Sequence, residues 1–375
     1  MIKSKNNYLQ KKSIEDIDLN EQRIFYRVDY NVPMENNKVM EGFRIDSTLD
    51  TIRYMLNKRC KYIIIGSHLG RPKNREECSL KPLVSYLENK LKEKLIFTDI
   101  NKNIENGKIF LMENLRYYDE EKNFIKNTAL YKWIEKNADI CVMDGFGVAH
   151  RWSGSVNGIK LNVYAGLLMK KEISMTSCLN NSDLIILGGK KVKDKLPLIK
   201  SLINYTKNIY FTGAMCFTLI KYKYKENIGK NYCEGEDVVY EIYSEAKKHN
   251  CKIFLPLDFI STEPYAIIKR NCIKDEICVD IGPETIEDLK LLVEKSNIIF
   301  WNGPPGIFEE NNSSKGTEEL IKMLEGKDVL IGGGDTLAAV NKFNGKFQKL
   351  STGGGALLTM IEGGDMPGID VIQNK

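Results

Sequence analysis

Two glycine triplets near the C-terminus carry residue types that bind phosphate. The first, Gly332-Gly333-Gly334, precedes Asp335 and Thr336, and the second is Gly353-Gly354-Gly355. Glycine lets a ligand touch the backbone, the free N–H groups of a helix start attract anions, and a nearby aspartate can hold Mg²⁺. One such triplet can be only a tight strand-to-helix turn. Two of them in one region, one followed by Asp-Thr, favour a phosphate site.

Four lysines follow a third glycine cluster, the pair Gly188-Gly189. They lie within Gly188-Gly189-Lys190-Lys191-Val192-Lys193-Asp194-Lys195. A lysine run is usually a solvated surface, yet lysines at a helix start after Gly-Gly also stabilise a transferring phosphoryl group. Because an apolar strand pattern precedes the glycines, we favour the second interpretation.

A second set of polar residues lies in the N-terminal half, where arginines follow successive strand patterns. It comprises Arg27, Arg44, Arg71, Arg116 and Arg151, together with Asp29, Asn31 and His68. Any one of these arginines alone is typical of a solvated surface, and a lone histidine before a glycine is typical of a loop. Strand ends in a parallel sheet meet at one edge, and arginine binds phosphate or carboxylate at two points. Together they predict a basic pocket for a small anion.

A rigid Gly/Pro loop follows another strand pattern near the C-terminus. It runs Asn302-Gly303-Pro304-Pro305-Gly306-Ile307-Phe308-Glu309. The loop is interpreted either as a turn or as an apolar wall for a base, with Glu309 reaching ribose hydroxyls. The loop alone does not decide between the two.

The elements that must position these residues alternate between strand and helix patterns, which predicts an α/β fold with parallel sheets. Strands are expected at 23–28, 62–65, 108–112, 139–143, 183–187, 208–212, 252–256, 298–301 and 329–331. Helices are expected at 46–57, 79–91 and 163–181 and from residues 213 and 236 onward. A chain of 375 residues predicts two domains, and the helical pattern at 163–181 carries no site residues, so it is the expected bridge.

The composition excludes several classes of protein. Hydrophobic residues make up 42% and charged residues 28%, as in a soluble globular protein, and a net charge of +5 is too weak to indicate nucleic acid. Nine cysteines form no Cys-x-x-Cys pair and there are only three histidines, so neither a zinc cluster nor a disulfide framework is expected. No signal-like or membrane-spanning stretch is seen. We therefore expect a cytoplasmic protein, with no heptad seam to argue against a monomer.

With these pieces in order, the chain resembles the phosphoglycerate kinase family over nearly its whole length. The resemblance rests on Arg27-Val28-Asp29-Tyr30-Asn31-Val32-Pro33, Ser67-His68-Leu69-Gly70-Arg71-Pro72, Glu113-Asn114-Leu115-Arg116, Ala149-His150-Arg151, Leu187-Gly188-Gly189, Trp301-Asn302-Gly303-Pro304, Gly332-Gly333-Gly334-Asp335-Thr336, Ser351-Thr352-Gly353-Gly354-Gly355-Ala356 and Glu362-Gly363-Gly364-Asp365-Met366-Pro367-Gly368. Each motif is weak alone, but their order is highly specific.

The resemblance implies two Rossmann-like domains joined by a helical hinge. The implied division is 1–165 for 3-phosphoglycerate, 166–181 as interdomain helix, 182–362 for Mg-nucleotide, and 363–375 packing back on the N-terminal domain. It also implies the glycolytic interconversion of 1,3-bisphosphoglycerate plus ADP with 3-phosphoglycerate plus ATP, using Mg²⁺, with no nucleic acid or membrane partner.

The resemblance also implies roles for individual residues. Substrate contacts would come from Asp29, Asn31, Arg44, His68, Arg71, Arg116 and Arg151. Nucleotide contacts would come from Gly189, Lys191, Lys195, Asn302, Glu309, Gly334, Asp335 and Thr336, with Asp335 holding the metal. Stabilisation of the transferring phosphoryl group would fall to Arg44, Lys191 and the helix start at Gly353, Gly354 and Gly355.

The sequence departs from the usual family pattern at several positions near these sites, including Leu357 and Thr359, where serine and glutamate are usual, and four further positions. These four are Lys190 for a small residue, Ser153 for a histidine, Met143 for an asparagine and Ala214 for a glycine. Other enzyme classes fit less well, since the chain lacks the P-loop motif and a Gly-x-Gly-x-x-Gly in the context that dinucleotide enzymes need. A non-enzymatic binding protein of the same fold is the remaining alternative.

Overall fold

The computed structural model describes residues 8–75, 77–123, 125, 128–262 and 264–375. The chain forms two compact units, the first of which combines the chain up to Ser174 with Gly363–Lys375, and the second of which is Met175–Glu362. The division falls inside helix α7 (Leu167–Ser177), which belongs to the segment predicted as the bridge.

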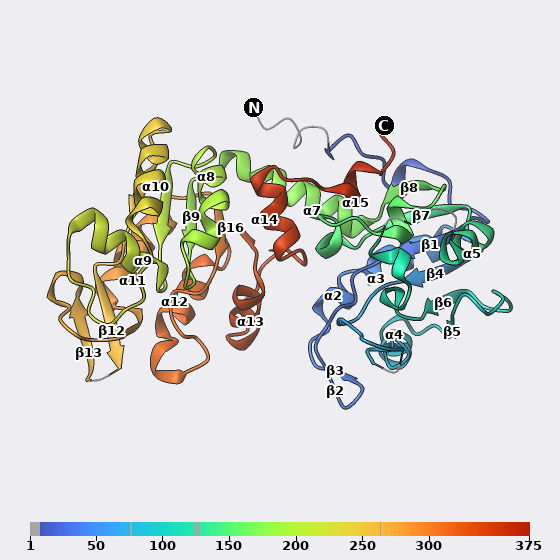
Figure 1. The fold of residues 1–375 in the computed structure, drawn as a ribbon, viewed down its shortest axis with the longest axis horizontal. Coiled ribbons are helices and arrows are strands. Elements are labelled where there is room, and N and C mark those ends of the chain that lie inside the picture. Colours follow the sequence, from blue (N-terminus) through green and yellow to red (C-terminus); the bar gives the residue numbers. More distant parts are fainter. Residues whose placement is uncertain (1–7, 76, 124, 126–127, 263) are drawn as a thin grey trace. The chain divides into compact units, whose positions relative to one another are not determined.

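The first unit is built on a six-stranded sheet in the order β5-β6-β4-β1-β7-β8, in which every neighbouring pair is parallel (Figure 1). Its strands are β1 (Arg23–Arg27), β4 (Tyr62–Gly66), β5 (Leu95–Thr98), β6 (Ile109–Met112), β7 (Ile140–Met143) and β8 (Asn162–Ala165). Runs such as Ile109–Met112 are buried throughout because helices and loops cover both faces of a parallel sheet. These runs carry the apolar signal that predicted β1, β4, β6 and β7.

Helices α3 (Leu49–Asn57) and α4 (Leu83–Leu91) contribute to the main core of this unit through Ile52, Met55 and Leu87. Helix α5 (Ala129–Asn137) packs against β1. Shorter elements are the hairpin β2 (Met34–Glu35) and β3 (Lys38–Val39), helices α2 (Phe43–Asp46), α6 (Gly154–Asn157) and α15 (Pro367–Asp370), and several 3-10 turns.

The second unit contains another parallel sheet of six strands, in the order β11-β10-β9-β15-β16-β17. Its strands are β9 (Leu184–Leu187), β10 (Asn208–Phe211), β11 (Lys252–Phe254), β15 (Ile298–Asn302), β16 (Asp328–Ile331) and β17 (Lys349–Leu350). Its helices are α8 (Leu196–Ile203), α9 (Met215–Leu219), α10 (Glu236–Lys248), α11 (Pro283–Glu294), α12 (Lys315–Leu324), α13 (Gly334–Lys342) and α14 (Gly355–Glu362). The two parallel sheets confirm the predicted α/β class.

A small antiparallel sheet in the second unit was not predicted. It consists of β13 (Tyr265–Lys269), β12 (Asp258–Thr262) and β14 (Cys278–Ile281), paired in that order. A buried carboxylate begins β12 at Asp258, and another interrupts the apolar pattern of β14 at Asp280. The signal for these strands is therefore weaker than that of the parallel strands.

Several predicted helix bounds are corrected by the structure. The segment 163–181 begins as strand β8, because Val163 pairs with Cys141 of β7, and α7 starts only at Leu167. The helix expected from residue 79 starts at Leu83, directly after Pro82. The helix expected after Gly188-Gly189 starts at Leu196, so Lys191 precedes it instead of lying in its first turn. Within the described ranges, no helix is both long and apolar enough to span a bilayer.

Candidate active site

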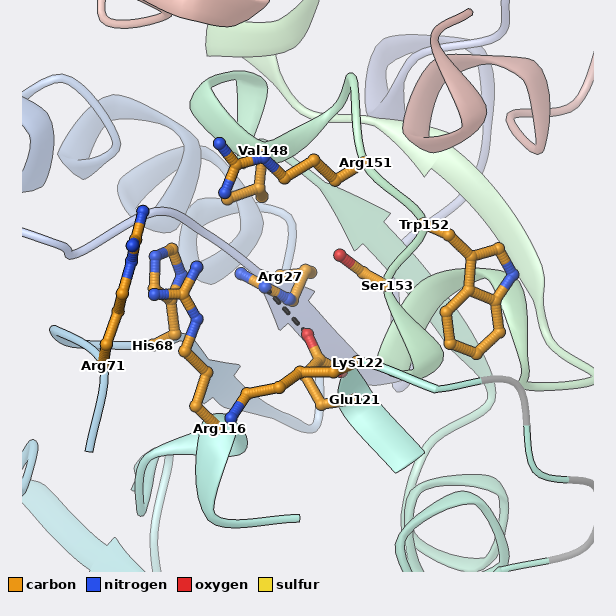
Figure 2. Close-up of a pocket in the computed structure, with 10 residues that line it drawn as sticks. All are labelled: Arg27, His68, Arg71, Arg116, Glu121, Lys122, Val148, Arg151, Trp152 and Ser153. Carbon is orange, nitrogen blue, oxygen red and sulfur yellow. Dashed lines mark hydrogen bonds and ion pairs between the residues drawn. The ribbon is translucent and has the colours of Figure 1, made fainter. Parts of the chain in front are cut away.

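A basic cavity of about 550 Å³ opens at the carboxyl edge of the first sheet (Figure 2). The loops after β1, β4, β6 and β7 meet there because these four strands are neighbours in the sheet. The cavity is lined by Arg27, His68, Arg71, Arg116, Glu121, Lys122, Val148, Arg151, Trp152 and Ser153. Four guanidinium groups and one lysine face a single carboxylate, so this cavity suits an anion.

Arg27 forms the floor of the cavity although it is the last residue of a buried strand, with only 1% of its surface exposed. Its guanidinium donates to Glu121 Oε1 at 2.9 Å, to Ser155 Oγ at 3.0 Å and to the Val28 carbonyl. Breaking such a buried pair is costly because it leaves one charge uncompensated. Arg27 and Glu121 therefore form a fixed base of the cavity.

His68, Asp29 and Arg44 form a chain of contacts beside the cavity. Asp29 Oδ2 accepts from Arg44 Nη1 at 2.9 Å, and Asp29 Oδ1 lies 3.7 Å from His68 Nε2. Burial and the neighbouring arginines hold the pKa of His68 well below its usual value, so its ring is neutral near pH 7. The Nδ1 atom of His68 is buried without a hydrogen-bond partner among the described residues, as expected of a group that awaits a ligand.

Three arginines at this edge carry charge that no carboxylate in the described ranges neutralises by an ion pair: Arg71, Arg116 and Arg151. Arg116 donates to the Gly70 carbonyl, and Gly70 N–H in turn donates to Asn31 Oδ1 at 2.8 Å. Burial, followed by repulsion from Arg27, lowers the pKa of Arg116. The positive charge at this edge is therefore available to an anionic ligand.

The structure thus brings the predicted substrate residues to one strand edge in two layers. His68, Arg71, Arg116 and Arg151 line the cavity. Asp29, Asn31 and Arg44 do not line it but bond to each other or to the Gly70 loop. Sequence reasoning missed the lining residues Glu121, Lys122 and Trp152. Glu121 ends a single 3-10 turn at 119–121, which is too short to give a periodic pattern, and Lys122 and Trp152 lie outside helices and strands.

A second cavity, of about 530 Å³, lies in the second unit beside the antiparallel sheet. Its apolar walls include Pro304, Pro305 and Phe308 of the Gly/Pro loop and the aromatic pair Phe217 and Phe259, whose ring centroids are 4.8 Å apart. Gly189, Glu309 and Asp335 are the predicted nucleotide residues that line it. An apolar slot with a few polar groups at its rim fits a nucleotide base and ribose.

The loops around this cavity are tied together by buried polar residues. Asn302, which is 3% exposed, donates to the Gly332 carbonyl at 2.7 Å, and Thr336 Oγ1 accepts from Gly303 N–H at 2.8 Å. Lys195 Nζ donates to Asn302 Oδ1 at 2.7 Å and to the Gly188 carbonyl at 2.8 Å. These bonds join the carboxyl ends of β9, β15 and β16, so three predicted nucleotide residues also hold the site together.

Both predicted glycine helix starts are present. Helix α13 begins at Gly334 and α14 at Gly355, after the neighbouring parallel strands β16 and β17. A Cβ added at Gly334, Gly354 or Gly355 would meet no atom within 4 Å, so the space over these residues is open. Gly333, by contrast, has φ +101°, and a Cβ there would lie 2.7 Å from Asn302 Nδ2. Open backbone at a helix start is what an anion needs.

The lysines of segment 190–195 separate into different environments. Lys191 is exposed, and its Nζ lies 4.0 Å from Asp194 Oδ2. Lys195 is largely buried, and this burial lowers its pKa to about 8, although the charge of Asp335 acts to raise it. Lys190 Nζ lies 5.3 Å from the ring centroid of Tyr232, and both residues line the second cavity. Sequence reasoning named Lys190 as one of the four lysines after Gly188-Gly189 and as a departure from the family pattern, but it missed Tyr232, which follows no strand or helix pattern.

The residues present fit a magnesium ion that arrives with a nucleotide. Asp335 is exposed in the first turn of α13 and lines the cavity. In the part of the chain that the structure describes, no cluster of three or more histidine, cysteine or acidic residues could hold a metal by itself. Mg²⁺ in nucleotide sites typically uses one or two carboxylates and completes its shell with phosphates and water.

Comparison with known proteins agrees with this architecture. A family model described as phosphoglycerate kinase matches residues 14–364. The phosphoglycerate kinase of Candida albicans is 36% identical, and the alignment covers 97% of this chain and 99% of that protein. The enzyme of the same name from Leptospira biflexa is 35% identical, with coverage of 96% and 98%.

Solved structures give the same result. The structure of phosphoglycerate kinase from Coxiella burnetii matches with a TM-score of 0.86 and 32% identity, covering 96% of this chain and 98% of that one. Phosphoglycerate kinase from Pyrococcus horikoshii matches with a TM-score of 0.77 and 25% identity, with the same coverage. This chain therefore belongs to the phosphoglycerate kinase family.

Proposed function

We propose that this chain transfers the acyl phosphate of 1,3-bisphosphoglycerate to ADP, reversibly, giving 3-phosphoglycerate and ATP in glycolysis. Membership of the family, over nearly the full length of chain and relatives, supports the activity. The structural observation that carries the proposal is that one unit contains a basic cavity and the other contains an apolar cavity with glycines among its lining residues. Nothing in the structure or the comparisons favours a non-enzymatic binding protein.

The basic cavity is proposed to bind 3-phosphoglycerate. Arg71, Arg116 and Arg151 supply guanidinium groups for two-point binding of its phosphate or carboxylate, and His68 offers its unpartnered ring nitrogen. Asp29 and Asn31 accept hydrogen bonds from Arg44, and Asn31 also accepts one from Gly70 N–H. These bonds hold Arg44 and the Gly70 loop at the edge of this site.

The second cavity is proposed to bind ADP or ATP. The base lies between the apolar walls, Glu309 reaches the ribose, and Gly189, Lys195 and Asn302 support the phosphate side. Asp335 would hold the magnesium ion, with Gly334 and Thr336 beside the phosphates. The ion neutralises charge on the phosphate chain when it is bound.

The chemical step needs positioning and charge neutralisation and no general base. In the direction of ATP formation, a β-phosphate oxygen of ADP attacks the acyl phosphorus, the bond from phosphorus to the carboxyl oxygen breaks, and the carboxylate leaves with the electron pair. We assign stabilisation of the equatorial oxygens to Arg44, Lys191 and the helix start at Gly353, Gly354 and Gly355. The Gly353 N–H donates to Ser351 Oγ at 3.1 Å in this structure, so it would have to exchange that bond for one to the phosphoryl group. Lys191, exposed and only weakly paired with Asp194, is free to move to that position.

Because the two proposed binding sites belong to different units, we propose hinge bending about the predicted bridge at 166–181, which would exclude water during transfer. We further propose a cytoplasmic monomer without nucleic-acid or membrane partners. The nine cysteines, none of which forms a disulfide, support a reducing compartment, and the small net charge supports the absence of a nucleic-acid partner.

The first test is ADP formation from MgATP, with and without 3-phosphoglycerate, by wild type and Lys191→Ala. Wild type is expected to require 3-phosphoglycerate, and the variant to lose at least about 100-fold in kcat because a charge on the transferring group is removed. Lys193→Ala, which changes another exposed lysine of the same loop, is the matched control and should retain activity. If folded wild-type protein forms no ADP in response to 3-phosphoglycerate, the proposed function is wrong.

A further inference from the structure

We propose that His150, as a neutral imidazole, is a positioning residue that orients Arg151 toward the anionic substrate. The proposal rests on the proposed function, because it assigns a role within the same basic cavity. Arg151 Nε donates a hydrogen bond to His150 Nε2 at 3.0 Å. It is the one side-chain hydrogen bond that Arg151 makes within the described ranges.

Three of the other arginines near the cavity are held by bonds to the protein. Arg27 is bound by the Glu121 carboxylate, Arg44 by the Asp29 carboxylate and Arg116 by a backbone carbonyl. Arg151 is exposed and follows the short turn of residues 146–148, so packing does not hold its side chain in place. The orientation shown in Figure 2 therefore depends on the bond to His150.

The direction of this bond fixes the state of the histidine. A guanidinium only donates, so Nε2 must accept with a lone pair, and the proton of the neutral ring is then on Nδ1, which is buried and has no hydrogen-bond partner among the described residues. A doubly protonated ring has no lone pair and would repel Arg151. Burial lowers the pKa of His150, as does the nearby charge of Arg151, while Asp29 opposes the shift. The neutral form that the bond requires is thus the form present near neutral pH.

A neutral acceptor has a chemical advantage at this position. A carboxylate would orient Arg151 equally well but would neutralise it and compete with an incoming phosphate or carboxylate. The imidazole engages only Nε, which leaves the two terminal nitrogen atoms of the guanidinium for the substrate. His150 therefore orients the guanidinium of Arg151 without neutralising its charge.

The test compares His150→Leu, His150→Gln and His150→Glu by steady-state kinetics. His150→Leu removes the acceptor and should raise KM for 3-phosphoglycerate by about 10- to 100-fold, the size expected for one hydrogen bond to a charged group. His150→Gln restores a neutral acceptor and should stay within about 3-fold of wild type. His150→Glu, which neutralises Arg151, should be at least as impaired as His150→Leu. KM for MgATP should not change in any of them.

Two controls distinguish a misoriented Arg151 from a general loss of activity. His249→Leu changes an exposed histidine of the second unit and should leave both KM values unchanged. Titration calorimetry with 3-phosphoglycerate should give the same order of affinities, so the role of His150 is tested even if wild type binds this ligand without turning it over. A His150→Leu protein with wild-type affinity, or a His150→Gln protein as impaired as His150→Leu, would overturn that role. Wild type that neither binds 3-phosphoglycerate nor uses it would instead reject the proposed function and the role of His150 with it.

Discussion

At the residue scale, Lys195 shows how burial sets the range of pH over which a charge is available. Its ammonium group contacts Asn302 Oδ1 and the Gly188 carbonyl, both of them neutral acceptors. Burial lowers its pKa to about 8, and Asp335 only partly opposes this effect. Above that pH the free protein therefore loses a positive charge next to the proposed phosphate site.

We predict that the affinity for nucleotide weakens as Lys195 loses its proton. KM for MgADP should rise by about 5-fold between pH 7.5 and 9.5, because the neutral amine no longer attracts phosphate. Lys195→Arg, which stays charged over this range, should show a flatter profile even if its KM is higher throughout. The measurement is KM for MgADP against pH for both proteins, and parallel profiles would contradict the prediction.

At the element scale, the start of helix α7 is held by the buried carboxylate of Asp144. Asp144 Oδ1 accepts from Met169 N–H at 2.7 Å, while Oδ2 accepts from Tyr26 Oη at 2.7 Å and Thr51 Oγ1 at 2.5 Å. A Cβ at Gly166 would lie 2.2 Å from this carboxyl group, so only glycine fits between β8 and α7. Asp144 also directly follows β7 and precedes the loop that carries His150 and Arg151. One side chain thus links the bridge helix to the basic cavity.

Asp144 should make the stability of the first unit depend on pH, because its carboxyl group is buried in the folded state. Burial raises its pKa to about 6, from 3.8 in the unfolded chain. Between about pH 4 and 6 the folded state therefore binds more protons than the unfolded state, so this group's contribution to stability falls as pH rises. Asp144→Asn should lack that fall, whereas Asp144→Ala should cost about 3 kcal/mol at pH 7 by leaving buried donors unpaired.

This prediction is checked by urea unfolding at pH 4.5, 5.5 and 6.5. The free energy of unfolding of wild type minus that of Asp144→Asn should decrease as pH rises. Asp50→Asn, at an exposed position of α3, serves as the matched control and should show a difference near zero. If the difference in unfolding free energy between wild type and Asp144→Asn does not change with pH, the prediction of a raised pKa for Asp144 is wrong.

At the scale of the whole molecule, the first unit is closed by the last residues of the chain. Met366, Ile369 and Ile372 are buried, Gly368 N–H donates to the Ala149 carbonyl at 2.9 Å, and Gln373 N–H donates to the Val163 carbonyl at 2.9 Å. Lys11 Nζ donates to the carbonyls of Asp370 and Ile372. The C-terminal segment therefore supports the loop of the basic cavity as well as the edge of the sheet.

Removal of residues 363–375 should destabilise the first unit by roughly 5 kcal/mol, from the loss of three fully buried apolar side chains. Trp133 and Trp152 lie in the first unit and Trp301 in the second, so variants that keep only one of these tryptophans report on each unit separately. In urea the Trp133 transition should shift to lower concentration, while the Trp301 transition serves as the reference. If instead the Trp133 midpoint is unchanged, the segment is not part of the folded first unit.

The sequence alone determined the α/β class and the main chemical groups. Strands of a parallel sheet are buried on both faces, so short apolar runs such as Ile109–Met112 and Leu184–Leu187 are visible without any tertiary information. Glycine triplets before helix patterns are equally local, and α13 and α14 begin where those triplets end. The arginines could be placed at one edge because that edge follows from parallel topology.

The tertiary structure decided what depends on contacts between distant segments. Arg27 and Glu121 are 94 positions apart, Lys195 and Asn302 are 107 apart, and neither pair is marked by any spacing. The same lysine-rich segment contains the exposed Lys191 and the buried Lys195, and only packing separates them. Local patterns depend on the period of a strand or helix, whereas burial, pKa and bonding partners depend on which segments the fold brings together.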